Sequence, residues 1–172
     1  PLELRSPAPV AVARAVISTA LSWGRTSFAL GVWLGFVCLL RPGEICLLKK
    51  EDVRLVTSQF RPREFRRLGV LILQKPKTGK VGAWKQHVLI EEAPLLTVLA
   101  LFLSLLEAGE ALWPFTQATF ANRVAAVLDF LGCPNLFPPA GLRAGGATHI
   151  WQVLRNFGLL RLKGRLLNVR SL

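Results

Sequence analysis

Residues 26–45 read "TSFALGVWLGFVCLLRPGEI", an uncharged apolar run that ends at Arg41 and is followed by a proline, a glycine and Glu44. A run that is apolar on all sides predicts a helix buried on most of its faces. It is shorter than the roughly 20 residues that a membrane-spanning helix needs. Pro42, with an acid two residues later, predicts a short second helix. The stretch therefore predicts a buried helix with an arginine and a glutamate at its end.

The flanking sequence predicts more helices and a few strands. The short helix has Lys49 and Lys50 near its predicted end, and helical periodicity recurs in residues 8–23, 94–107, 117–131 and 142–156, with a last helix starting near Asn168. The segments "DVRLV", "LGVLILQ" and "WKQHVLI" predict three strands, with a hairpin at Pro76 and Gly79 between the last two. The predicted fold class is mainly α with a small antiparallel β-sheet (α+β), in a single domain covering 1–172.

The basic residues are numerous and segregated. The net charge is +12, with a sequence pI near 11.1. Residues 61–85 contain a single acid, Glu64, and residues 139–172 contain none. Such segregation predicts a basic face for a polyanion, most directly nucleic acid, although a general bias toward arginine would also raise the charge. The mean hydropathy of +0.42 excludes a disordered chain.

Several common sites are excluded by their motifs. "KPKTGKV" lacks the first glycine and the Ser or Thr of a phosphate-binding P-loop, and "GLRAGGA" is not a dinucleotide fingerprint. The two histidines, His87 and His149, have no clustered carboxylates, and the three cysteines follow no zinc or disulfide spacing. We therefore expect no metal and no cofactor.

Three elements remain, and each has an ordinary interpretation when taken alone. Arg41 and Glu44 fit a salt bridge at a helix end, and the lysines of "KPKTGK" (residues 75–80) fit a charged hairpin tip. The third is "GLRAGGATHIWQ", in which Arg143 begins a predicted helix and a glycine pair follows. Each glycine inside a helix costs about 1 kcal/mol relative to alanine, so the pair predicts a close backbone approach or special packing.

In this order, the three elements resemble the catalytic domain of the tyrosine recombinases, or phage integrase family, from about Ala8 onward. "LLRPGEI" is similar to the first arginine box, with Arg41 and Glu44 in place. "AGLRAGGAT" is similar to the second box, with Arg143. The hairpin lysine of the family is best matched by Lys77, with Lys75 as the second choice.

The resemblance implies a role for each matched residue. Arg41 and Arg143 would neutralise the phosphate of a DNA strand, since guanidinium groups match phosphate oxygens. Lys77 would give a proton to the leaving 5′ oxygen, and Glu44 would orient the helix or a cationic neighbour. Further contacts with DNA are expected from the basic residues Lys75, Lys80, Lys85 and Arg165.

The chain departs from the family pattern at three places. Ala140 stands where a histidine is usual, and Leu166 stands where the family carries His or Trp. The chain contains no tyrosine, and the resemblance places the nucleophile near position 175, beyond Leu172. We therefore expect a fragment of the catalytic domain, without an N-terminal DNA-binding domain or the tyrosine segment, that is incomplete or inactive by itself.

The resemblance also implies partners and a location. The expected partner is double-stranded DNA, bound in a homo-tetrameric synapse, in a recombinase of a mobile element. The location would be the nucleus in a eukaryote, or the cytoplasm and nucleoid in a bacterium, and the protein would not be secreted. Two alternatives stay open: a catalytically dead DNA-binding module of the same fold, and a basic helical protein that lies on anionic membranes.

Overall fold

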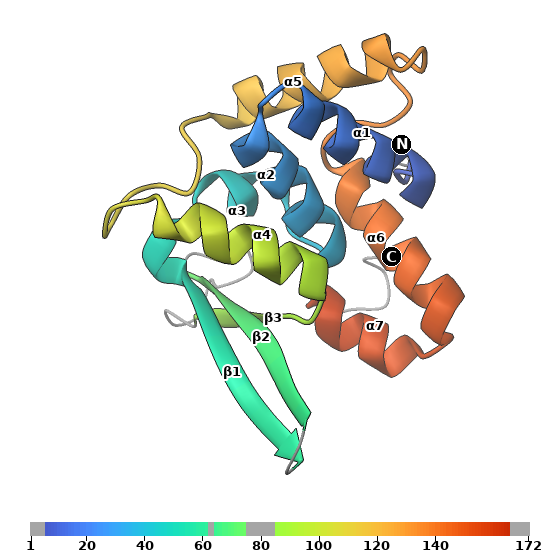
Figure 1. The fold of residues 1–172 in the computed structure, drawn as a ribbon. Coiled ribbons are helices and arrows are strands. Elements are labelled where there is room, and N and C mark those ends of the chain that lie inside the picture. Colours follow the sequence, from blue (N-terminus) through green and yellow to red (C-terminus); the bar gives the residue numbers. More distant parts are fainter. Residues whose placement is uncertain (1–5, 62–63, 75–84, 166–172) are drawn as a thin grey trace. The chain divides into compact units, whose positions relative to one another are not determined.

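The computed structural model describes residues 6–61, 64–74 and 85–165 and contains two compact units (Figure 1). The first unit comprises Pro1–Cys46 and Phe115–Leu172, and the second comprises Leu47–Pro114. The described residues form seven α-helices, one 3₁₀ turn and one three-stranded antiparallel sheet. This confirms the predicted class, mainly α with a small sheet. The single domain over 1–172 stays a prediction.

The first unit is helical and is built around an apolar helix. Its helices are α1 (Val10–Ser22), α2 (Thr26–Val37), α3 (Pro42–Cys46), α5 (Gln117–Phe130), α6 (Gly141–Leu154) and α7 (Phe157–Gly164). Helix α2 packs against α1 and α6, and α5 packs against α1 and α3 (Figure 1). Phe28, Leu30 and Leu34 of α2 are fully buried, as the all-round apolar pattern predicts. Phe28 also meets Phe120 of α5 edge to face, with 5.5 Å between ring centroids.

Helix α6 lies unusually close to its neighbours because of a glycine pair. A Cβ on Gly145 would lie 2.0 Å from the carbonyl oxygen of Ala8, and one on Gly146 would lie 2.0 Å from the carbonyl oxygen of Phe36. No side chain fits at such distances, so backbone meets backbone at both positions. This confirms the close approach predicted from the sequence. It also fixes the start of α6, and with it Arg143, against the end of α2.

Helix α5 begins at a capping residue whose removal is a simple test of the helical unit. The Thr116 hydroxyl accepts a hydrogen bond from the Thr119 N–H at 3.2 Å. We expect Thr116→Ala to lower the free energy of unfolding by about 1 kcal/mol. Thr148→Ala is the control, because that exposed hydroxyl only bonds back to Ala144 within α6 and should cost little. Urea unfolding measures both variants, and an equal loss of unfolding free energy in Thr116→Ala and Thr148→Ala would contradict the capping role.

One helix prediction is wrong in its extent. Helix α3 ends at Cys46, before the lysines that were expected at its end. Lys49 instead donates its N–H to Asp52, and a 3₁₀ turn, Lys50–Asp52, leads into the first strand. The helix predicted to start near Asn168 lies outside the described residues, and the last described helix, α7, starts at Phe157.

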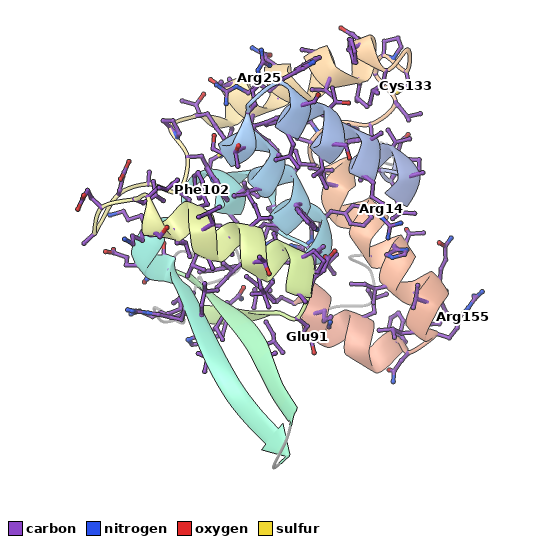
Figure 2. The ribbon with its side chains drawn as sticks, in the orientation of Figure 1. Arg14, Arg25, Glu91, Phe102, Cys133 and Arg155 are labelled. Carbon is purple, nitrogen blue, oxygen red and sulfur yellow. The ribbon has the colours of Figure 1, made fainter. Side chains whose placement is uncertain are left out.

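The turn between α6 and α7 leads into a helix that the sequence did not predict. Arg155 has a φ of 49° and lies in the left-handed region, which ends α6. The Leu160 N–H then donates to the carbonyl of Asn156, and the next helix begins. Figure 2 shows Arg155 at this turn, with its side chain pointing away from the helices.

The second unit is a twisted sheet with one helix on it. Strand β1 (Val53–Arg61) pairs with β2 (Glu64–Leu73), which pairs with β3 (Gln86–Ile90), all antiparallel. Helix α4 (Ala93–Ser104) packs against β2, where a Cβ on Gly69 would lie 2.8 Å from Leu96. Within the described ranges, no helix has both the length and the apolar character needed to cross a membrane.

Candidate functional site

The site is centred on the carboxylate of Glu44, in the first turn of α3. Backbone N–H groups at the start of any helix lack a partner within the helix, and the Glu44 carboxylate supplies one at the start of α3. The N–H of Arg41 donates to Oε2 of Glu44 at 2.8 Å, and the Nη1 of Arg41 donates to Oε1 at 2.9 Å. The Glu44 residue is 8% exposed, whereas the Arg41 side chain is 32% exposed. Arg41 is thus tied to a buried acid while part of its side chain faces solvent.

Arg143 reaches the same place from the first turn of α6. Its Nη1 donates to the carbonyl oxygen of Leu39 at 3.0 Å, and its Nη2 donates to the carbonyl oxygen of Gly164. The Nη1 also lies 4.0 Å from Oε2 of Glu44. The two arginines that the sequence predicts as partners therefore meet at one carboxylate, although they are far apart in the chain.

A third guanidinium joins them from the end of α7. The Nη2 of Arg165 donates to Oε2 of Glu44 at 3.0 Å and to the carbonyl oxygen of Leu39 at 2.9 Å. The sequence predicts a DNA contact for Arg165 and does not predict this ion pair with Glu44. A glycine directly before the arginine is the only local sign of a turn there, and it does not indicate the partner.

The charges in this cluster shift the pKa values of its members. Burial acts to raise the pKa of Glu44, but the N–H of Arg41 and the charges of Arg165 and Arg41 outweigh it, and the pKa lies below its ordinary value. Burial, together with repulsion from Arg41 and Arg165, lowers the pKa of Arg143 to about 10. Arg143 therefore still carries its charge at neutral pH, and three guanidinium groups face one carboxylate.

Of the other predicted site residues, two are described and four lie outside the described residues. Ala140 is the residue before α6, and its side chain makes no capping hydrogen bond. Lys85 is exposed next to β3 in the second unit. The candidates Lys75, Lys77, Lys80 and Leu166 lie outside the described residues.

The arrangement favours an anion. Guanidinium groups that are held in place by hydrogen bonds and exceed the nearby negative charge attract phosphate or another oxyanion. Among the residues that the structure describes, no three His, Cys, Asp or Glu side chains gather in a way that could hold a metal ion. The chemistry that these groups offer is electrostatic: binding an anion and stabilising negative charge.

The fold has clear neighbours among solved structures. The chain is similar to the XerH site-specific recombinase bound to its difH substrate, with a TM-score of 0.74 and 15% identity over 98% of this chain and 49% of that one. It is similar to a lambda integrase dimer bound to a COC' core site, with a TM-score of 0.69 and 16% identity over 99% of this chain and 48% of that one. It is also similar to the Tn1549 transposon integrase in complex with transposon right end DNA, with a TM-score of 0.69 and 13% identity over 99% of this chain and 60% of that one.

These similarities concern the fold, which is that of the catalytic domains of tyrosine recombinases and integrases. The chain spans about half the length of the XerH and lambda integrase structures that it matches. No protein-family model matches the sequence, and no curated protein does.

Proposed function

We propose that this chain is the catalytic part of a tyrosine recombinase or integrase, which binds duplex DNA and holds the phosphate at which a strand is cut and rejoined. The observation that carries the proposal is the meeting of Arg41 and Arg143 at Glu44, in a fold shared with DNA-bound recombinases and integrases. In this proposal, both arginines neutralise the phosphate as negative charge grows on its oxygens.

Arg41 and Arg143 have different parts in the proposal. Arg41 has the more exposed side chain, 32% against 17%, so it offers the more accessible donors to a phosphate. Arg143 is fixed by two main-chain carbonyls and defines the geometry of the pair. Lys77 is proposed as the acid that protonates the leaving 5′ oxygen, with Lys75 as the second choice. A tyrosine supplied from outside this sequence would be the nucleophile, and the covalent link would be a 3′-phosphotyrosyl bond.

Duplex binding by single-arginine variants tests the phosphate site. We expect Arg41→Ala to weaken binding about tenfold and to reduce the slope of log affinity against log salt by about one, because one phosphate contact is lost. Fluorescence anisotropy at several salt concentrations measures both quantities. Arg14→Ala, which removes an exposed arginine of α1, is the matched control. If Arg14→Ala has the same effect as Arg41→Ala, the binding is only a general response to charge.

A second experiment separates an enzyme from an inactive module. The assay is covalent capture of nicked duplex DNA by a form of the chain extended through its natural C-terminal continuation. Capture that Arg143→Ala abolishes supports the enzyme. No capture by either protein, with normal duplex binding, supports the DNA-binding module. Flotation with anionic liposomes completes the test, since preference for liposomes over DNA would overturn the proposal.

A further inference from the structure

Arg165 occupies the most enclosed position of the three arginines around Glu44. Its side chain is 10% exposed, against 17% for Arg143 and 32% for Arg41. Its Nη2 makes two hydrogen bonds at once, to Oε2 of Glu44 at 3.0 Å and to the carbonyl oxygen of Leu39 at 2.9 Å. This part of the guanidinium is directed at protein acceptors rather than at solvent.

The backbone around Arg165 supports this orientation. Arg165 follows α7 with a φ of 52°, a left-handed conformation that is uncommon for a residue with a side chain. The residue before it, Gly164, accepts a hydrogen bond from Arg143 through its carbonyl oxygen. The turn is therefore held twice, once by Arg143 through the backbone and once by Arg165 through its side chain. Such a conformation persists only where the surrounding contacts fix it.

The two oxygens of Glu44 are divided among its partners. Oε1 accepts from the side chain of Arg41, whereas Oε2 accepts from the backbone of Arg41 and from Arg165. Arg165 thus orients the carboxylate that holds Arg41. It also shares the carbonyl oxygen of Leu39 with Arg143. Arg165 therefore contacts an acceptor that holds Arg41, which is Glu44, and an acceptor that holds Arg143, which is the Leu39 carbonyl.

We propose that Arg165 is a positioning residue that acts through Glu44 and the Leu39 carbonyl to fix Arg41 and Arg143, rather than a residue that contacts DNA itself. This inference rests on the proposed DNA-binding function and gives Arg165 a different role from the DNA contact predicted from the sequence. A direct contact would act independently of Glu44, whereas a positioning role requires it.

A double-mutant cycle in duplex affinity distinguishes the two roles. The four proteins are the unchanged chain, Arg165→Met, Glu44→Gln and the double variant. We expect Arg165→Met to weaken binding roughly three- to tenfold in the unchanged chain but less than about twofold when Glu44 is already Gln. Equal factors in both backgrounds, with a salt slope reduced by about one, would show a direct phosphate contact and overturn the proposal.

Lysine at position 165 gives an independent comparison. Arg165→Lys keeps a positive charge, which a phosphate contact tolerates, but it loses the planar fork that reaches two acceptors. We expect it to bind nearly as weakly as Arg165→Met, and full affinity would overturn the positioning role. If Arg165→Met does not fold by circular dichroism, the cycle is run with Arg165→Lys under the same criteria.

A measurement without DNA separates this inference from the proposed function. Loss of Arg165 should raise the pKa of Glu44, and carbon NMR of its carboxyl group reports that titration. An unchanged Glu44 titration in the Arg165 variant overturns the inference even if DNA binds. If the unchanged chain does not bind duplex DNA while Glu44 titrates as expected, the proposed function is overturned and the ion pair between Arg165 and Glu44 stands.

Discussion

Gly146→Ala is expected to destabilise the protein by about 3 kcal/mol or more, because the new methyl group would lie 2.0 Å from the Phe36 carbonyl oxygen. The obstacle is backbone, so no side chain can rotate to make room, and α6 has to move away from α2. Leu39, whose carbonyl accepts from two arginines, also lies within 2.7 Å of the added atom. Denaturant unfolding measures the loss, and duplex affinity should fall with it.

The control is a helical glycine with space around it. Gly158 lies in α7, and the nearest atom to an added Cβ is the Asn156 Oδ1 at 3.4 Å. Gly158→Ala should therefore change stability by no more than about 1 kcal/mol, in the direction that helix propensity favours. A Gly146→Ala protein as stable as the Gly158→Ala protein would show that α6 does not approach α2 so closely.

Glu44→Gln should have the second large effect and lower the free energy of unfolding by about 3 kcal/mol at neutral pH. The amide keeps the shape but removes the only negative charge that faces three guanidinium groups in the described cluster, and breaking a buried ion pair from one side costs about that much. Urea unfolding at pH 7 measures it. Glu51→Gln, at an exposed carboxylate of the other unit, should stay within about 0.5 kcal/mol.

The pH dependence of this effect has a definite sign. The pKa of Glu44 is lower in the folded chain than its ordinary value, so the ionised form stabilises the fold. That contribution is present above the ordinary pKa and disappears as the pH falls through the folded value. The stability difference between the unchanged chain and Glu44→Gln should therefore shrink as the pH is lowered from about 7 to about 3. A constant difference would contradict the ion-pair origin.

Helix positions followed from the sequence where an apolar pattern indicates burial. The run that became α2 carries this signal alone, since its N-cap residue Arg25 makes no side-chain cap hydrogen bond. The segment that became α5 also has terminal signals, Thr116 at its start and Gly132 after its end. Helix α7 was not predicted, because its start depends on the left-handed Arg155 rather than on periodicity. The helix predicted near Asn168 lies outside the described residues. The first two strands extend beyond the predicted segments because pairing of β1 with β2 continues along polar sequence that carries no alternation.

The site was only partly visible in the sequence. Arg41, Glu44 and Arg143 could be selected because they stand in motifs with recognisable spacing, and the structure brings them together. The contact of Arg165 with Glu44 has no such spacing, since it depends on a turn of unusual backbone conformation. Lys77 lies outside the described residues, and its role stays a prediction.

Two of the anchors in the arginine cluster are main-chain carbonyls, those of Leu39 and Gly164. Every amino acid carries such an oxygen, so evolution can exchange the side chains at these positions without removing the acceptors. The geometry of such a cluster depends on the course of the backbone more than on which side chains occupy these positions. That is consistent with a fold shared with recombinases and integrases at 13–16% identity.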